Sequence, residues 1–289
     1  MGSHLPAPPR QPGYTPIAAA PQFELRWLGL AKLRLPVNGD TYTLEAGGNE
    51  VGIDILGGQA AVSARGPSGP TDYVQVGQRP SPFSGPPTMI YLPRATTARI
   101  TCVSGPLEAL LFQAPARRDT LPRVLRPGDV RAQDFGQSNW QRSVYPCIGS
   151  EVDADRLMMG ETHTPSGNWS SYPPHKHDSE QPPEHVSEEI YHFLIDPPFG
   201  FGLQTLWAQP SRSEPPEQAA YAVHNGDSVI IPSGYHPVVV APGFRMITVW
   251  AYAGDSRVWG AWAAEPEYAR LLEQPDPRLE TETPDEQSG

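Results

Sequence analysis

Short apolar segments separated by turn residues constrain the fold of this chain more than any other feature of its sequence. Segments such as "VGIDIL", "MIYLP", "DSVIIP" and "FRMITVWAY" recur along the chain and are bounded by Gly, Pro, Asn and Asp. Runs of this length and composition are typical of β-strands closed by turns. With 36 Pro and 27 Gly among 289 residues, this punctuation predicts an all-β protein built from many short strands.

Helical periodicity is convincing only near the end of the chain. In "EPEYARLLEQ", residues 265–274, Tyr268, Leu271 and Leu272 share one face, which predicts a short C-terminal helix. The first 22 residues are rich in Pro and Ala, and residues 276–289 are acidic without an aromatic side chain. Both ends are therefore predicted to be mobile.

Two long passages follow the same plan, "VGQRPSPFSGPPTMIYLPRATTARI" and "VHNGDSVIIPSGYHPVVV". Each leads from a Gly-containing turn through an apolar strand to a proline, Pro93 or Pro232, and then to a second strand. Aligning the prolines places Thr97 where His236 stands. A repeat of this size predicts two tandem β-sandwich or barrel domains. We place a leader at 1–22, a first domain at 23–125, a second domain at 126–275 and a tail at 276–289.

Composition narrows the class of partner. The net charge of −11 disfavours nucleic acid and anionic membranes, which attract basic surfaces, and favours a small solute. The two cysteines, Cys102 and Cys147, are too few for a disulfide scaffold and too far apart for a zinc-type pair. No apolar run approaches the ~20 residues of a membrane-spanning helix, and we expect a cytoplasmic protein.

The stretch "SSYPPHKHD", residues 170–178, places two histidines one residue apart. On a strand, His175 and His177 would point the same way and Lys176 the opposite way. Two imidazoles on one wall can share a metal ion at about 2.0–2.1 Å. By itself this pair is weak evidence, because two solvated histidines explain it as well.

Two later segments strengthen the metal hypothesis. In "SEEIYHF", residues 187–193, alternation puts Glu189 on the same face as Tyr191, and "NGDSVIIPSGYHPVVV" places His236 at the beginning of another strand. Three histidines and one carboxylate at strand ends suit a divalent metal with positions open to substrate. Glu184 and Glu188 compete for the acidic position, and strand phase favours Glu189.

The spacing of HxH, an acid and a distant "GDSVIIPSGYH" resembles the two motifs of the cupin superfamily. Four longer strings are similar to the IolB family of isomerases: "GQSNWQRSVYPCIG", "TPSGNWSSYPPHKHD", "EEIYHFLIDPPFGFGLQ" and "NGDSVIIPSGYHPVVVAPG". The resemblance spans roughly residues 25–270 and is denser in the second half. It implies two tandem cupin barrels, each a jelly roll, of which only the second binds metal. The implied ligands are His175, His177, Glu189 and His236.

The resemblance also implies an activity. The expected reaction is aldose–ketose isomerisation of 5-deoxy-D-glucuronate to 5-dehydro-2-deoxy-D-gluconate in myo-inositol catabolism, through a metal-stabilised enediolate. Because no redox change is needed, zinc or manganese would serve. Two alternatives stay open: an oxidative cupin, such as an oxygenase or decarboxylase, and a sugar-acid-binding cupin without turnover.

Further residues receive expected roles from their positions near the implied ligands. Arg142 matches an arginine of the family pattern and would pair with the substrate carboxylate, while Tyr172 and Tyr235 would bind hydroxyl groups. The base is left open among Glu184, Tyr191 and a metal-bound hydroxide. We expect a sugar acid as the partner and a homo-oligomer, most simply a dimer.

Overall fold

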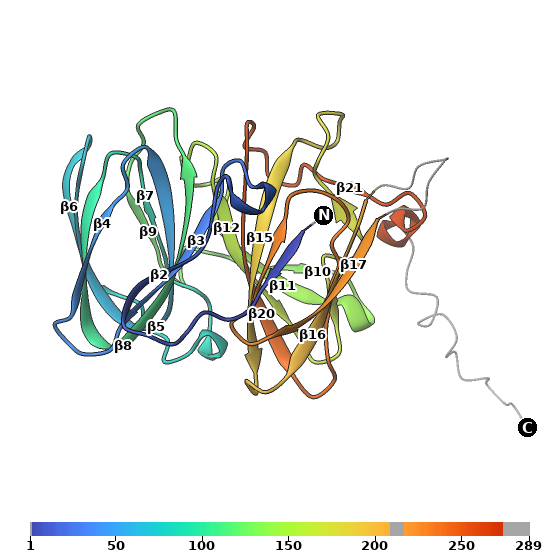
Figure 1. Ribbon diagram of the computed structural model, residues 1–289, viewed down its shortest axis with the longest axis horizontal. Coiled ribbons are helices and arrows are strands. Elements are labelled where there is room, and N and C mark those ends of the chain that lie inside the picture. The colour runs from blue at the N-terminus through green and yellow to red at the C-terminus, as the bar shows by residue number, and fades with distance from the viewer. Residues whose placement is uncertain (1, 209–216, 274–289) are drawn as a thin grey trace, which may run out of the picture.

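The protein consists of two β-barrels that lie side by side (Figure 1). The computed structural model describes residues 2–208 and 217–273. Within these residues every regular element is a strand or a short 3-10 turn, so the all-β prediction is confirmed. No helix in the described part of the chain is long and apolar enough to cross a membrane.

The first barrel is formed by one sheet in the order β2-β3-β8-β5-β7-β9, with β4 added to β8 and β6 added to β5. Bulges shift the register between β5 and β8 near Gly57 and Gln59, and such bulges bend long strands so that a sheet can curl. Its elements are β2 (Gly13–Ala19), η1 (Gln22–Glu24), β3 (Gly29–Leu35), β4 (Thr41–Glu45), β5 (Asn49–Gly66), β6 (Gly69–Val76), η2 (Pro82–Ser84), β7 (Met89–Leu92), β8 (Thr97–Pro115) and β9 (Arg123–Leu125).

The second barrel contains a seven-stranded sheet, β1-β18-β15-β20-β12-β11-β10, a four-stranded sheet, β13-β19-β16-β17, and the pair β14-β21. Its elements are β1 (Ser3–Leu5), β10 (Gln133–Phe135), η3 (Ser138–Trp140), β11 (Arg142–Ile148), β12 (Met158–Thr164), β13 (Trp169–Ser170), β14 (His175–Lys176), β15 (Ser187–Asp196), β16 (Phe201–Trp207), β17 (Gln218–His224), β18 (Ser228–Ile231), β19 (Val238–Val240), β20 (Arg245–Gly254), β21 (Ala263–Ala264) and η4 (Ala269–Leu272).

The N-terminal segment is part of this fold. β1 pairs antiparallel with β18 of the second barrel, where the dark blue strand lies in Figure 1, and β2 pairs with β3 of the first. The His4 ring lies 2.9 Å from the Asp227 carboxylate, and the Tyr221 hydroxyl donates to the Gly2 carbonyl. The prediction of a mobile leader over residues 1–22 is therefore wrong for its described part. A Pro- and Ala-rich composition does not prevent a segment from adding to a sheet edge, because the backbone supplies the bonds.

The C-terminal helix is shorter than predicted. The segment "EPEYARLLEQ" forms only one 3-10 turn, Ala269–Leu272, and not an α-helix. So short a turn gains too few backbone hydrogen bonds to repay helix nucleation unless an apolar face is packed, and none of the residues Ala269–Leu272 is buried. The predicted acidic tail, residues 276–289, lies outside the described residues.

Register relates the two barrels. Val51 of β5 is paired with Leu92, the last residue of β7, and Glu189 of β15 is paired with Ile231, the last residue of β18. A proline follows each of these apolar strands, which agrees with the repeat seen in the sequence. Val51 thus occupies in the first barrel the place that Glu189 occupies in the second, and it belongs to an apolar cluster that fills the first barrel.

The position of the first barrel that corresponds to His236 also lacks a metal-binding side chain. Thr97 is exposed at the beginning of β8, and its hydroxyl donates to Glu45, whereas the His236 side chain is fully buried. Across the described residues, the grouping of His, Cys, Asp and Glu donors that could hold a metal lies in the second barrel.

A buried polar cluster joins the barrels. Arg79 of the first barrel donates to both oxygens of Glu161 on β12, with Nη1 at 2.9 Å from Oε2, and to Asp54 on β5 at 3.2 Å. Burial raises the pKa of Asp54, and the neighbouring Glu161 raises it further. Burial also opposes ionisation of Glu161, but the Arg79 charge and hydrogen bonds outweigh it and lower the pKa of Glu161 to about 2. Arg79 therefore keeps Glu161 ionised between the barrels.

An Arg79→Met variant is expected to lose roughly 3–5 kcal/mol of unfolding free energy at pH 7, because it leaves carboxylates buried without their cation. In the native protein the lowered pKa of Glu161 stabilises the fold at pH values above the ordinary pKa of a glutamate. This stabilisation is lost as the pH falls towards 2. In the variant, Glu161 would keep the hydrogen bond with His163 at 2.7 Å but lose the charge of Arg79, and burial would raise its pKa. Protonation of Glu161 should therefore narrow the difference in unfolding free energy between variant and native protein as the pH falls from 7 towards 4. Urea unfolding at both pH values measures this.

The control is Arg245→Met. Arg245 pairs with Asp196 at 2.7 Å in an exposed bridge, and exposed pairs contribute about 1 kcal/mol or less. An equal loss in both variants, or an Arg79→Met deficit independent of pH, would contradict the role given to Arg79.

Candidate metal centre and cavity

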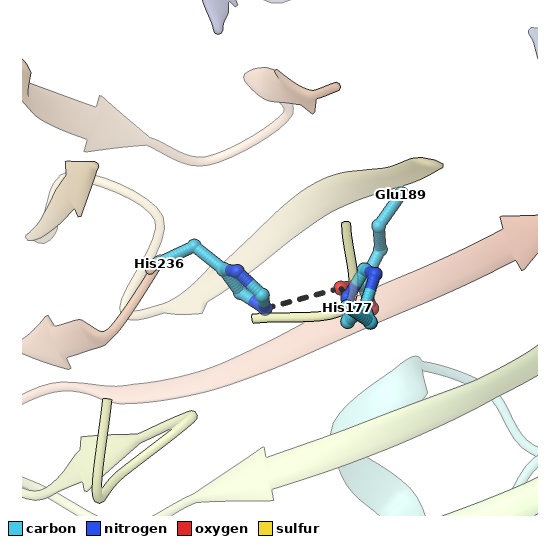
Figure 2. Close-up of side chains that lie close together, drawn as sticks. All are labelled: His177, Glu189 and His236. Atoms are coloured by element: carbon cyan, nitrogen blue, oxygen red, sulfur yellow. Dashed lines mark hydrogen bonds and ion pairs between the residues drawn. The ribbon is translucent and has the colours of Figure 1, made fainter. Parts of the chain in front are cut away.

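Three side chains from separate segments of the second barrel meet at one point. One donor atom each from His177, Glu189 and His236 lies within 4.8 Å of the others, and Figure 2 shows the three side chains converging. Glu189 Oε2 lies 3.1 Å from His177 Nε2 and 3.3 Å from His236 Nε2. His177 follows β14, Glu189 lies on β15 and His236 precedes β19, so barrel closure brings them together.

Backbone carbonyls orient both imidazoles. His177 Nδ1–H donates to the Ser187 carbonyl at 2.8 Å, and His236 Nδ1–H donates to the Gly234 carbonyl at 2.8 Å. Because a carbonyl can only accept, Nδ1 of each ring carries the proton and Nε2 faces the centre. Metal-binding histidines are commonly held in this way by a hydrogen bond from the second ring nitrogen.

The charges in the cluster suit a cation. Burial opposes ionisation of Glu189, but hydrogen bonds and positive charge from His177 and His236 prevail and lower the pKa of Glu189 to about 2. Burial disfavours the imidazolium form of His177, yet the contact with Glu189 raises its pKa. His236 Nε2 is buried and has no well-aligned hydrogen-bond partner among the described residues, although Glu189 lies close. A carboxylate and an unsatisfied imidazole nitrogen at one buried point fit a divalent ion.

His175 lies at the edge of this cluster. Its ring centroid is 4.8 Å from that of His236 and 4.9 Å from that of Trp262, and its Nδ1–H donates to the Pro173 carbonyl at 3.3 Å. Burial and the neighbouring histidines lower its pKa well below the ordinary value, so it is a neutral imidazole. The structure places His175 beside the three convergent donors and not among them.

Glu184 does not reach the centre, so its predicted roles as base or ligand are corrected. Its carboxylate accepts from Lys176 Nζ at 2.9 and 3.0 Å, on the opposite side of the strand from His177. Lys176 also donates to Asp178 at 2.6 Å, and Asp178 accepts the Gly234 N–H at 2.8 Å. Because the Gly234 carbonyl accepts the hydrogen bond that orients His236, Asp178 of the acidic loop indirectly fixes the position of this proposed ligand.

Gly234 is required at this bend. Its φ is +91°, and a Cβ there would lie 2.6 Å from the Trp207 carbonyl oxygen, so a side chain would be strained as well as obstructed.

Glu188, the other competing acid, also points elsewhere. Its carboxylate accepts the backbone N–H groups of Arg26 at 2.7 Å, Trp27 at 2.8 Å and Leu28 at 2.6 Å, all from the first barrel. Strand alternation separates it from Glu189. The geometry thus favours Glu189, as strand phase predicted.

A cavity of about 480 Å³ opens onto the His/Glu cluster, which could hold a metal, and is lined by both polar and aromatic side chains. Arg142 lies in its wall, with its guanidinium 5.6 Å from the Phe135 ring centroid and 6.0 Å from that of Trp140. Among the described residues it has no carboxylate partner, and burial lowers its pKa to about 10. A cation placed in this way could bind an anionic ligand.

Tyr191 lines the same cavity. Its hydroxyl lies 2.6 Å from Ser171 Oγ, and burial, reinforced by the charge of Glu189, raises its pKa well above the ordinary value. Ser171 adopts a φ of +51°, in the left-handed region that non-glycine residues seldom occupy and that recurs at functional sites. Tyr191 therefore presents a protonated phenol to the cavity.

The two tyrosines predicted to bind hydroxyl groups are separated by the fold. Tyr172 lines the cavity, with its ring centroid 5.8 Å from that of Trp140. Tyr235 packs its ring against Trp207 at 5.8 Å and is not among the described residues that line this cavity. The prediction of a substrate contact for Tyr235 is therefore wrong, because its ring packs against Trp207 at the end of β16.

Several residues of the cavity received no role from sequence reasoning, among them Ser171, Tyr252 and Trp262. Ser171 lies within the quoted string before the HxH pair, but its strained backbone leaves no local signature. Tyr252 is opposite Glu189 across β15 and β20, and Trp262 reaches His175 through the β14–β21 pairing. Both contacts depend on pairing between distant segments.

Comparison with known proteins agrees with this geometry. The profile of the KduI/IolB family matches residues 12–271. A 5-deoxy-glucuronate isomerase of Shouchella clausii is 36% identical over 190 residues, which cover 65% of this chain and 68% of that protein. The 5-deoxy-glucuronate isomerase of Bacillus velezensis is 32% identical over 258 residues, which cover 87% and 90%.

Solved structures agree as well. The crystal structure of an IolB-like protein from Salmonella typhimurium aligns with a TM-score of 0.84 and 28% identity, covering 93% of this chain and 98% of that one. An oxalate decarboxylase of Lactobacillus farciminis aligns with a TM-score of 0.65 at 11% identity, covering 94% and 88%, and this likeness concerns the fold alone. The molecule is a tandem pair of cupin barrels with one His/Glu cluster that could hold a metal. The chain belongs to the KduI/IolB family.

Proposed function

We propose that the protein is a metal-dependent aldose–ketose isomerase that converts 5-deoxy-D-glucuronate to 5-dehydro-2-deoxy-D-gluconate. One observation carries the proposal: one cavity is lined by donors that could hold a metal and by the Arg142 guanidinium, which has no carboxylate partner among the described residues. A sugar acid has a carbonyl with an adjacent hydroxyl at one end and a carboxylate at the other, so it matches both features. The activity of the relatives named above supports this assignment.

The proposed ligands are His177, Glu189 and His236, with His175 as a fourth from the edge of the cluster. A bound divalent ion, zinc or manganese, would supply Lewis acidity towards the carbonyl and hydroxyl oxygens of the open-chain sugar. The protein holds the Nε2 atoms and the Glu189 carboxylate towards this point in advance, which avoids rearrangement during the reaction.

The remaining cavity residues bind and orient the substrate. Arg142 donates to its carboxylate and so fixes which end of the sugar reaches the cluster. The Tyr191 hydroxyl, held by Ser171 at 2.6 Å, donates to a substrate oxygen, and its raised pKa keeps the proton on the phenol at neutral pH. We therefore assign Tyr191 as a proton donor. Trp250, Trp259 and Trp262 cover the apolar part of the cavity and limit access of water.

The test is conversion of 5-deoxy-D-glucuronate by the purified, metal-replete protein in D₂O, followed by NMR. Loss of the C1 aldehyde resonance and incorporation of one solvent deuterium are expected, because the carbon-bound proton moves through a base that exchanges with solvent. Removal of the metal with a chelator should abolish turnover, and re-addition should restore it.

Other outcomes point to the other classes. Oxygen consumption, or release of CO₂ from the carboxylate, would indicate that the protein is an oxidative cupin and not an isomerase. Tight binding of the sugar acid without conversion would indicate a binding protein. A homodimer and a cytoplasmic location stay predictions, and sedimentation of the purified protein tests the former.

A further inference from the structure

Two buried carboxylates reach across the boundary between the barrels in opposite directions. Glu188, on β15 of the second barrel, accepts the three backbone N–H groups of residues 26–28, which precede β3. Glu50, on β5 of the first barrel, accepts the three backbone N–H groups of residues 155–157, which precede β12, at 2.6–2.8 Å. The exposed fraction is 3% for Glu188 and 0% for Glu50.

We call these two sets of three hydrogen bonds the Glu188 clamp and the Glu50 clamp. The two clamps occupy equivalent places in the two barrels. Glu50 is paired with Ala114 on β8, and Glu188 is paired with Ala253 on β20, and each is the second residue of its strand. They differ in the residue that follows. Glu50 precedes Val51, which packs in the apolar interior of the first barrel, whereas Glu188 precedes Glu189 in the metal cluster.

We propose that Glu188 is a positioning residue for the metal ligand Glu189, and that the first barrel, through residues 26–28, thereby takes part in the active site. This inference rests on the metal centre of the proposed function. Successive side chains of a strand point to opposite faces, so three hydrogen bonds to Glu188 on the outer face fix the backbone from which Glu189 projects inwards. Hydrogen bonds to an ionised acceptor are short and strong.

The position of Glu189 must be accurate if it is to bind a metal, so the Glu188 clamp should affect metal affinity. Ligands must be held to within about 0.5 Å of their productive positions. Glu189 is the third residue of β15, and strand ends are the parts of a sheet that open most readily. The Glu188 clamp ties this end of β15 to the first barrel by three hydrogen bonds. The equivalent Glu50 clamp secures a strand that carries no ligand at the corresponding place.

The experiment compares Glu188→Gln with Glu50→Gln in the full chain. Each substitution keeps the side-chain size and removes the negative charge that accepts three backbone N–H groups. Glu50 also accepts the Tyr91 hydroxyl at 2.6 Å, so the control variant disturbs at least as many hydrogen bonds. Zinc affinity is measured by chelator competition, and the coordination geometry is followed by the visible absorption of the Co²⁺-substituted protein. Glu188→Gln is expected to raise the Kd for zinc by about 10- to 100-fold, the range seen when partners of metal ligands are removed, and to change the Co²⁺ spectrum. Glu50→Gln should lower thermal stability to a similar extent and leave both metal readouts unchanged.

A second measurement uses the native protein and so does not depend on the folding of a variant. Coupling between two sites is reciprocal, so metal addition should slow hydrogen exchange at the amides of Trp27 and Leu28. Exchange at the amides of Arg156 and Leu157, in the other clamp, should not change.

Three results would overturn the inference: an unchanged zinc Kd in Glu188→Gln, an equal rise in both variants, or equal effects of metal on the two amide groups. Native protein that binds zinc but does not isomerise the sugar acid would refute the proposed function and leave the positioning role intact. Native protein that binds no divalent metal would refute both.

Discussion

A His236→Ala variant is expected to lose its bound metal and its isomerase activity together. The substitution removes a fully buried imidazole whose Nε2 lies 3.3 Å from Glu189, and no other described side chain replaces it in the cluster. Because loss of an indirect partner already costs 10- to 100-fold in metal affinity, loss of a ligand should raise the Kd by more than about 100-fold. Elemental analysis after dialysis, with the NMR assay, measures both effects.

Thr97→Ala is the matched control, since Thr97 occupies the place of His236 in the sequence repeat and is exposed. Its metal content and activity should equal those of the native protein, with a change in stability within about 0.5 kcal/mol. If His236→Ala folds poorly, Glu189→Gln removes the ligand charge with little change in volume and serves the same purpose. Equal metal loss in the His236 and Thr97 variants would contradict a single active barrel.

The second large effect is expected from Arg142→Met. This substitution removes the cavity cation for which the described residues offer no carboxylate partner, and so removes the charge-assisted hydrogen bonds that we assign to the substrate carboxylate. We expect kcat/KM to fall by about 100-fold, which corresponds to roughly 3 kcal/mol of transition-state stabilisation. Metal content should stay unchanged, because Arg142 is not a ligand.

Selectivity distinguishes this role from a structural one. The native enzyme should discriminate strongly between the sugar acid and its neutral analogue with a hydroxymethyl group at that end, and Arg142→Met should lose most of this discrimination. Arg142→Lys should be intermediate, since it keeps a charge without the planar fork of donors. A variant that loses activity equally towards both substrates would show that Arg142 supports the cavity and does not read the carboxylate.

Much of the architecture could be predicted because the signals are local. Side-chain alternation over "HKH" and "SEEIYHF" needs only the strand period of two residues, and it places Glu189 and Glu188 on opposite faces of the strand. The repeat around Pro93 and Pro232 is reproduced by the pairing of β5 with β7 and of β15 with β18. The same alignment gives Thr97 in the place of His236, whereas the correspondence of Val51 with Glu189 comes from the strand pairing alone.

The errors share a physical cause. Glu184 was given a catalytic role because it is close to the histidines in sequence, but its carboxylate pairs with Lys176 on the other face of the strand. Tyr235 precedes His236 and yet packs against Trp207. The leader was expected to be mobile on composition, although β1 completes an edge of the second barrel. In each case the partner lies on another strand and is invisible to a local pattern.

The sequence by itself determined the strand-rich fold, the two-barrel repeat and the set of candidate ligands, because these depend on short-range periodicity and on strings particular to one family. Only the tertiary structure decided which acid reaches the histidines, that Arg142 faces the same cavity without a carboxylate partner in the described chain, and that Glu188 ties the metal-binding strand to the other barrel. The Glu188 contact joins segments more than 100 residues apart through the packing of one barrel against the other, and the other two features depend on closure of the second barrel. The free energy that selects such contacts comes from burial and hydrogen bonding across the whole molecule, and no local pattern of residues contains it.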